Sequence, residues 1–291
     1  MTAQLPPGFI DIHSHILPGL DDGPESMVQC LEAARRYRAI GMNCVIATPH
    51  WLRFTGWAPA PERIARSVAE VEETLDKAGI PLKILPGMEI GFVDSLQLDF
   101  PAAQLLPLGG SGHYLIEFPL MVAYMRPDQL ILRLLRRKKI KVIVAHPERC
   151  IAFRDNEAAL EEMTAGGVLV QMNINSLLGG FGREIQQTAV NFLGRGLVHF
   201  LATDSHASDR RMPPDRDEWE LLGEYIGSAA VAAACAENPR RLLAGEPVVP
   251  VTADPQRLEK YFPGDCFRNE KKKNGTNGKG LAGMLRGLFR R

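Results

Sequence analysis

The sequence predicts an α/β fold in which parallel strands alternate with helices. Short runs rich in apolar and β-branched residues recur seven times along the chain, and segments with helical spacing separate them. The 291 residues are 45% hydrophobic, which is sufficient for one large core. Parallel strands need crossovers of about a dozen residues or more, and the intervening segments have that length. We therefore expect either a closed barrel or an open doubly wound sheet.

The predicted elements follow one another in strand–helix order. The strands are Phe9–His15, Asn43–Thr48, Leu82–Leu85, Tyr114–Phe118, Lys141–Ala145, Leu169–Asn173 and Val198–Thr203. The helices are Glu25–Ile40, Pro61–Ala78, Pro127–Lys138, Glu157–Ala165, Arg183–Arg195 and Ser228–Glu237, and a further short helix begins at Asn238-Pro239. Pro24 suits the first turn of the first helix, Gly41 suits the position after its end, and Gly79 closes the second.

Composition excludes several classes of protein. Lys+Arg and Asp+Glu both number 34, so the formal net charge is zero. This balance argues against a surface that binds nucleic acid throughout, although a local basic patch is compatible with it, and we expect no nucleic-acid partner. The apolar runs are far shorter than the roughly 18 residues of a membrane span, and the N-terminus has no signal-peptide pattern. The five cysteines are odd in number and lack a Cys-x-x-Cys spacing, which argues against disulfides and cysteine zinc sites. We expect a cytoplasmic protein.

The C-terminal segment differs in composition from the predicted domain over residues 1–262. Residues 263–280 are rich in Gly, Asn and Lys and predict a flexible basic linker. Residues 281–291 have apolar side chains at helical spacing beside arginines, which predicts a short basic amphipathic helix. Residues 268–291 carry eight Lys/Arg and one Glu, so the neutral chain combines an acidic body with a basic tail. The tail favours peripheral membrane contact, although a disordered terminus also accounts for it.

Potential metal ligands occur where the predicted strands end. The ligand candidates are His13, His15, His50, Glu89, Glu117, His146, Asp204 and His206, with Asp22 in the loop after the first strand. Residues two apart on a strand share a face, so His13 and His15 can converge on one metal, as can Asp204 and His206. In a barrel the carboxyl ends of the strands form one rim, where active sites are built.

Each candidate taken alone has a simpler interpretation. A single strand-end histidine is commonly an exposed loop residue, and Glu89 or Glu117 could be a surface carboxylate. Asp22 could instead be a helix N-cap. The joint pattern favours a polynuclear metal site, because all these positions fall on one predicted rim. His113 and His199 lie at the opposite ends of their strands, and we expect them to be structural or exposed.

Imidazole and carboxylate ligands without thiolate suit Mn²⁺, Fe or Zn²⁺. Metals in such a site lower the pKa of bound water from about 15.7 toward 7, which makes hydrolysis of a phosphate ester the natural reaction. Arg149 and Arg211 follow the fifth and seventh strands, and a guanidinium matches phosphate geometry. Arg210 could take the role of Arg211, and each arginine could also be a solvated loop residue.

These segments together resemble the PHP (polymerase and histidinol phosphatase) superfamily, and most closely its bacterial capsule-associated, manganese-dependent protein-tyrosine phosphatases. The resemblance runs from about Phe9 to Leu243 and rests on the segments Asp11-Ile12-His13-Ser14-His15, Asp21-Asp22-Gly23-Pro24, Thr48-Pro49-His50, Gly87-Met88-Glu89, Ile116-Glu117-Phe118, Ala145-His146-Pro147-Glu148-Arg149 and Thr203-Asp204-Ser205-His206. The Asp-Asp-Gly-Pro segment favours the tyrosine phosphatase branch over the histidinol phosphatase branch.

The resemblance implies a distorted, TIM-like (β/α)₇ barrel that holds three divalent metals, expected to be Mn²⁺. The first metal would be held by His13, His15, Glu89 and Asp204, the second by Glu89, Glu117 and His146, and the third by Asp22, His50 and His206. Arg149 and Arg211 would bind the phosphoryl group. The implied substrate is phosphotyrosine in a bacterial tyrosine kinase that regulates exopolysaccharide or capsule synthesis. The C-terminal tail is not part of that family pattern.

Three other functions compete with this interpretation. The Cys-x₅-Arg spacing of cysteine-based tyrosine phosphatases occurs at Cys30 and at Cys235, but both cysteines fall within predicted helices rather than before a helix N-terminus. A small-molecule phosphatase of the histidinol phosphatase type is the alternative within the metal class. The third is a scaffold that binds a membrane or kinase through the tail, which the full set of candidate ligands argues against.

Overall fold

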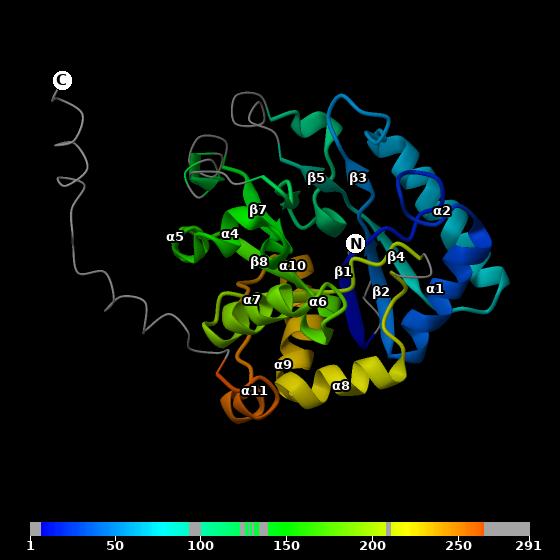
Figure 1. The fold of residues 1–291 in the computed structure, drawn as a ribbon. Helices are drawn as coiled ribbons and strands as arrows, with labels where there is room; N and C mark the ends of the chain where they lie inside the picture. Colours follow the sequence, from blue (N-terminus) through cyan, green and yellow to red (C-terminus); the bar gives the residue numbers. More distant parts are fainter. Residues whose placement is uncertain are drawn as a thin grey trace, which may run out of the picture.

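A computed structural model describes residues 7–92, 100–122, 126–127, 129, 131–133, 139–207 and 211–264 (Figure 1). Within these residues the strands are β1 (Phe9–Ser14), β2 (Met42–Ala47), β3 (His50–Trp51), β4 (Lys83–Pro86), β5 (Glu89–Gly91), β6 (His113–Glu117), β7 (Lys141–Ala145), β8 (Leu169–Asn173) and β9 (Phe200–Ala202). All their pairings are parallel, in the orders β1-β2-β4 and β3-β5-β6-β7-β8-β9.

The two sheets together follow the strand order of a barrel. β3 continues the chain path of β2 after the break at Thr48-Pro49, and β5 continues that of β4 after Gly87-Met88. A Cβ atom on Gly87 would lie 2.9 Å from Cγ2 of Ile46, so a glycine permits the close approach at this break. The end of β1 meets the segment after β9, where His15 N donates to Ser205 O over 2.8 Å. The prediction of an α/β fold with seven parallel strand paths is confirmed.

Helices surround these strands. The α-helices are α1 (Met27–Ala39), α2 (Pro61–Lys77), α4 (Ile151–Arg154), α5 (Glu157–Ala165), α6 (Ile174–Leu178), α7 (Arg183–Gly194), α8 (Arg216–Ile226), α9 (Ser228–Ala232), α10 (Asn238–Ala244) and α11 (Pro255–Tyr261). Short 3₁₀ helices cover Ala102–Gln104, Leu108–Gly110 and Pro147–Arg149, and one π-helical turn covers Ala233–Glu237. Figure 1 shows α1 and α2 beside β1, β2 and β4, and it shows α8, α9 and α11 together below the strands.

Several predicted boundaries need correction. Pro24 does not lie in the first turn of α1, because the Ser26 side chain caps the helix and accepts from Gln29 N. Gly41 follows the helix end with φ 80°, as expected. The last strand is shorter than predicted and begins at Phe200, while the predicted helix over Ser228–Glu237 changes to π-helical geometry at Ala233.

Some predicted segments cannot be compared with the structure. The predicted helix over Pro127–Lys138 lies partly outside the described residues. The predicted tail helix over residues 281–291 lies wholly outside them, as does most of the predicted linker. Within the described part of the chain, none of the helices is long and apolar enough to span a membrane.

The core divides according to the two faces of the strands. One cluster contains alternate residues of the strands, with Ile10 and Ile12 of β1, Cys44 and Ile46 of β2, and Phe200 and Ala202 of β9. Leu108 and Leu242 belong to the same cluster. The intervening strand residues, such as Val45 and Val144, belong to a larger cluster with the helices. The period of two therefore separates an inner cluster from an outer one.

A buried polar network connects β1 to the segment after β9 beneath the strand ends. The hydroxyl of Tyr37, which is fully buried, lies 2.9 Å from Asp11 Oδ2, 2.8 Å from Ser14 Oγ and 2.7 Å from Thr203 Oγ1. Asp11 also accepts from Thr203 N over 3.2 Å. Burial raises the pKa of the Tyr37 hydroxyl well above its usual value, so this group is a donor at neutral pH.

Replacing Tyr37 with phenylalanine should lower the free energy of unfolding by about 1–3 kcal/mol, because it removes the buried hydroxyl that Asp11, Ser14 and Thr203 all contact. Chemical denaturation of Tyr37→Phe measures this loss. Tyr225→Phe is the matched control, since the Tyr225 ring packs on Tyr261 and Phe262. Equal stabilities for the two variants would contradict the structural role of the network.

Candidate metal centre

The nine side chains predicted as metal ligands converge in the structure. They come from the end of β1 (His13, His15), the loop before α1 (Asp22), the starts of β3 and β5 (His50, Glu89), the end of β6 (Glu117) and the residues after β7 and β9 (His146, Asp204, His206). Ser26 caps α1, so the alternative role of Asp22 as the N-cap of this helix is wrong. All nine occur in groups whose potential ligand atoms lie within 4.8 Å of one another.

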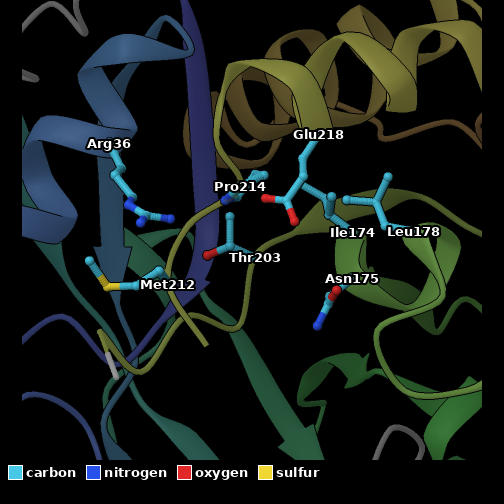
Figure 2. Close-up of a pocket in the computed structure, with 8 residues that line it drawn as sticks. All are labelled: Arg36, Ile174, Asn175, Leu178, Thr203, Met212, Pro214 and Glu218. Atoms are coloured by element: carbon cyan, nitrogen blue, oxygen red, sulfur yellow. The ribbon is translucent and has the colours of Figure 1, made fainter. Parts of the chain in front are cut away.

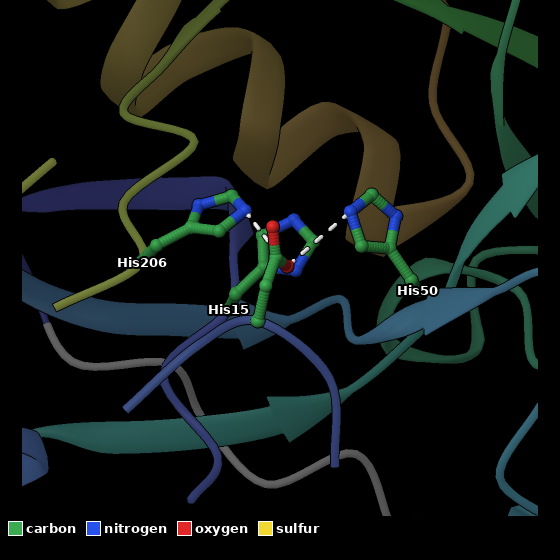
Figure 3. A group of neighbouring side chains, drawn as sticks. His15, His50 and His206 are labelled. Carbon is green, nitrogen blue, oxygen red and sulfur yellow. Dashed lines mark ion pairs between the residues drawn. The ribbon is translucent and has the colours of Figure 1, made fainter. Parts of the chain in front are cut away.

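Four such groups overlap. They are His15, Asp22, His50 and His206; His13, Glu89 and His146; His13, His15 and Asp204; and His50, Glu89 and Glu117. Figure 3 shows His15, His50 and His206 turned toward one another in the first group. Glu89, His13, His15 and His50 each belong to two groups. His15 belongs to one group with Asp22 and to another with Asp204, so its imidazole lies between two of the predicted metal sites.

Glu89 is at the centre of the cluster and is fully buried. Its Oε1 lies 3.0 Å from His146 Nε2 and 3.2 Å from His13 Nε2. Its Oε2 lies 2.8 Å from His50 Nδ1 and 3.3 Å from His15 Nε2. Each carboxylate oxygen therefore faces two imidazoles that come from different strands.

Several of these buried atoms lie close to one another but make no hydrogen bond of suitable geometry with the described residues. They are Nε2 of His13 and His15, Nδ1 of His50 and His146, and Oε2 of Glu89. Buried polar atoms in proteins are normally paired, and one cluster of unpaired nitrogen and carboxylate atoms calls for a missing partner. A divalent cation fits this donor set, because imidazole nitrogen and carboxylate oxygen both bind such ions.

The remaining ring nitrogens of three histidines are held by protein acceptors. His13 Nδ1 lies 2.9 Å from Gln171 Oε1, His15 Nδ1 lies 2.6 Å from Asp21 Oδ2, and His206 Nδ1 lies 3.0 Å from the carbonyl oxygen of Asp204. Such contacts fix the tautomer and leave Nε2 available as a ligand. The geometry thus favours neutral imidazoles that present Nε2 to the cluster.

Sequence reasoning missed three of the residues that orient these groups. Asp21 lies in the Asp-Asp-Gly-Pro segment, but its side chain was not among the predicted site residues. This side chain also accepts a hydrogen bond from His50 N over 2.8 Å. Gln171 and Asn173 lie on the same face of β8, where Gln171 donates to Asn173 and Asn173 donates to Asp204 Oδ2. The available signal was two polar residues at spacing two at the end of an apolar strand.

Burial and mutual charge shift the pKa values of the cluster. Burial alone would lower the pKa of His13, His15 and His50, but neighbouring carboxylates outweigh it and raise all three. Burial lowers the pKa of His146 to about 4. Burial and the charge of Glu89 raise the pKa of Glu117 to about 8. Without a metal, Glu117 therefore holds a proton at neutral pH, and the three imidazoles bind a second proton more tightly than free histidine does.

Backbone strain is concentrated around the cluster. Among the described non-glycine residues, positive φ occurs at Phe54, Lys139, His146 (29°), Asp204 (49°) and Ala207 (49°). Two of these are predicted ligands, and Ala207 follows a third. Such conformations cost about 1–3 kcal/mol each and persist where the surroundings enforce them. The backbone is thus strained where it turns His146 and Asp204 into the cluster.

The two predicted arginines meet at Asp204. Oδ2 of this carboxylate lies 2.7 Å from Arg149 Nη1 and 2.6 Å from Arg211 Nη2, while Oδ1 lies 3.5 Å from Nε2 of both His13 and His15. Arg211 Nη1 also lies 2.9 Å from His206 Nε2, an atom expected to bind metal. Arg149 stacks on the ring of Phe181 with its Cζ 4.4 Å from the ring centroid. Arg210 lies outside the described residues.

Both arginines line a cavity of about 200 Å³ together with the predicted ligands. Its wall comprises Asp22, His50, Leu52, Glu89, Glu117, Leu120, His146, Arg149, Asp204 and Arg211. A second cavity of about 110 Å³ lies between α1, α6, α8 and residues 212–214, and Arg36, Asn175 and Glu218 contribute its polar lining (Figure 2). None of the predicted ligands lines this second cavity, so the site is assigned to the first.

Residues expected to be inert are found outside the cluster. His199 is buried and accepts from Val170 N over 3.2 Å, and His113 is half-buried beside Ser111 at the start of β6. Cys30 is buried inside α1, and burial raises the pKa of its thiol to about 12. Cys235 is buried in the π-helical turn, where burial raises the pKa of its thiol as well. Neither thiol has the environment of a nucleophile.

Metal affinity should rise with pH. Because His13, His15, His50 and Glu117 have raised pKa values in the metal-free protein, cation binding must displace their protons. We expect the dissociation constant for Mn²⁺ to fall between pH 6 and pH 8, with proton release during titration. Calorimetric titrations in buffers of different ionisation enthalpy measure both quantities. A pH-independent affinity without proton release would contradict the assignment.

Asp21 should strengthen metal binding through His15. Asp21→Asn replaces the carboxylate that accepts from His15 Nδ1, and loss of such a contact typically weakens metal affinity about 10- to 100-fold. Titration of the variant with Mn²⁺ measures the change. Asp76→Asn, which alters an exposed carboxylate on α2, should leave the affinity unchanged. Equal affinities for both variants would exclude a role for Asp21 in orienting His15.

Comparisons with known proteins agree with this arrangement. The family model described as capsular polysaccharide synthesis, CpsB/CapC, matches residues 9–244. The tyrosine-protein phosphatase YwqE of Bacillus subtilis is 31% identical over 254 residues, covering 87% of this chain and 99% of its own. The tyrosine-protein phosphatase CpsB of Streptococcus pneumoniae is 29% identical over 243 residues, covering 81% of this chain and 98% of its own.

A solved structure is similar as well. A crystal structure from a study of YwqE and CpsB, which describes them as metal-dependent tyrosine phosphatases, superposes with a TM-score of 0.74 and 31% identity. It covers 84% of this chain and 99% of the solved chain. The resemblance inferred from the strand-end segments is thereby confirmed, and the chain belongs to the CpsB/CapC family of capsular polysaccharide synthesis.

Proposed function

We propose that this protein is a metal-dependent phosphatase that hydrolyses phosphotyrosine in a protein substrate. The observation that carries the proposal is one cavity in which buried imidazoles and carboxylates face two arginines. Imidazole nitrogens and carboxylate oxygens bind divalent cations, and guanidinium groups bind phosphate oxygens. The family membership and the names of the relatives support the same reaction.

Three divalent ions are assigned to the cluster, with Mn²⁺ proposed and Fe or Zn²⁺ as the other candidates. His13, His15, Glu89 and Asp204 would hold the first, Glu89, Glu117 and His146 the second, and Asp22, His50 and His206 the third. When bound, such ions lower the pKa of water from about 15.7 toward 7 and offset the negative charge of a phosphate.

The arginines complete the proposed site on the phosphate side. Arg149 and Arg211 both donate to Asp204 Oδ2, so an incoming phosphoryl group offers them further acceptors on its own oxygens. Phe181 stacks on Arg149 and restricts where its guanidinium can lie. A tyrosine leaving group has a pKa of about 10, which lowers the demand for a general acid compared with an alkyl ester.

The substrate is proposed to be a bacterial tyrosine kinase that regulates exopolysaccharide or capsule synthesis. The description of the matching family, capsular polysaccharide synthesis, supports this class of partner. A cytoplasmic location is proposed with it, and nucleic acid is not an expected partner. Peripheral membrane contact through residues 281–291 stays a prediction, since the tail lies outside the described residues and beyond the matched range.

The decisive comparison uses the Mn²⁺-loaded protein on a phosphotyrosine peptide and on histidinol phosphate. We expect higher kcat/KM on the peptide. His50→Ala removes a nitrogen 2.8 Å from Glu89 and should lower kcat by about two orders of magnitude or more. His113→Ala, outside the cluster, is the matched control and should retain activity.

Two results would contradict the proposal. Faster turnover of histidinol phosphate would replace the protein substrate with a small metabolite. Full activity of His50→Ala would remove the proposed site. Cys30→Ser should retain activity, since a thiol with a pKa of about 12 is protonated and no nucleophile at neutral pH.

A further inference from the structure

Two loops beside the cavity carry an unusual share of exposed apolar side chains. In the described part of the chain, six large hydrophobic residues are exposed, and four of these lie in two short segments. Phe54 (87%) and Trp57 (39%) follow β3, and Met121 (80%) and Val122 (47%) follow β6. Exposed apolar residues that gather on one surface commonly mark a binding site.

This exposed surface is continuous with the cavity. Leu52 and Leu120 line the cavity wall. Leu120 directly precedes Met121 and Val122 in the chain, and Leu52 lies two residues before Phe54. Trp57 stacks on the imidazole of His50, with ring centroids 5.7 Å apart and an interplanar angle of 5°. We refer to Leu52, Phe54, Trp57, Leu120, Met121 and Val122 as the apolar rim.

The loop after β3 is fixed with Phe54 exposed. Leu52 N donates to Trp57 O over 2.6 Å, and Thr55 N donates to Leu52 O over 3.1 Å. Phe54 has φ 70°, in the left-handed region that costs a bulky residue about 1–3 kcal/mol. Glycine or asparagine would relieve this strain, and both would remove an apolar ring from the rim. The strain and the exposure of Phe54 therefore coincide at the edge of the cavity.

We infer that the apolar rim binds the apolar side chains that flank phosphotyrosine in a polypeptide substrate. The inference rests on the proposed function. With the phosphoryl group at the arginines, the tyrosyl ring passes between Leu52 and Leu120, and the adjoining peptide crosses the exposed residues. Apolar flanking side chains are removed from water there, which favours binding. Charged or very small side chains contribute little binding free energy at this surface. The rim thus selects among phosphotyrosine sites by their neighbours in sequence.

The test compares kcat/KM of the Mn²⁺-loaded full chain on three substrates. They are a phosphotyrosine peptide with Leu and Ile on both sides, the same peptide with Gly and Ser there, and free phosphotyrosine. We expect the apolar peptide to exceed the Gly/Ser peptide by about fivefold or more, mainly through KM. In the double variant Phe54→Ser/Met121→Ser the ratio of the two kcat/KM values should fall toward one. The double variant Phe54→Leu/Met121→Leu should retain the ratio of the wild type.

Val249→Ser is the matched control, because Val249 is exposed (47%) and lies outside the rim; it should keep the preference. Equal kcat/KM on the two peptides, or a preference unchanged in the double serine variant, would overturn the inference. A monomer–dimer equilibrium abolished by the same variant would also overturn it, by assigning the rim to a second copy of the chain. The three substrates together separate the two proposals, since absence of turnover on all of them in the wild type would contradict the phosphatase function itself, whereas equal turnover of the two peptides would contradict only the role of the rim.

Discussion

Two buried carboxylates determine which other groups the site must contain. Glu89 and Asp204 are shielded from water, and an ionised carboxylate in such surroundings is costly unless cations or donors compensate it. Four imidazoles face Glu89, and two arginines, Asn173 and three imidazoles face Asp204. The protein groups alone leave several buried atoms of the cluster without a hydrogen bond, which supports the proposed binding of divalent cations there.

Asp204 joins the metal side of the site to the phosphate side. One oxygen faces His13 and His15, and the other holds both arginines and Asn173. Divalent cations held in the cluster would compete with the guanidinium groups for the charge of this carboxylate, which would leave Arg149 and Arg211 freer to bind a phosphate. The strained backbone at Asp204 is consistent with a residue whose position serves two purposes.

Much of this site was predictable because parallel strands align their carboxyl ends. Strand patterns placed His13, His146 and Asp204 on one rim. The affinity of imidazole and carboxylate groups for divalent cations then indicated a metal site. What could not be predicted depends on three-dimensional contact. Asp21 reaches His15 through a loop turn, and Gln171 reaches His13 from β8, 158 residues later in the chain, so neither contact is visible in local spacing. The predicted place of Pro24 in the first turn of α1 was wrong for a related reason. The Ser26 side chain caps this helix, so the helix begins after Ser26 and Pro24 lies before it.

The central claim is that divalent cations bind among the side chains at the strand ends. Crystals of the full chain grown with Mn²⁺ and measured near the manganese absorption edge test it directly, since anomalous differences locate the ions without reference to activity. We expect anomalous peaks within bonding distance of Glu89 and Asp204, with His13, His15 and His50 among the other ligands. Fully occupied manganese elsewhere on the protein, with none in this cavity, would contradict it.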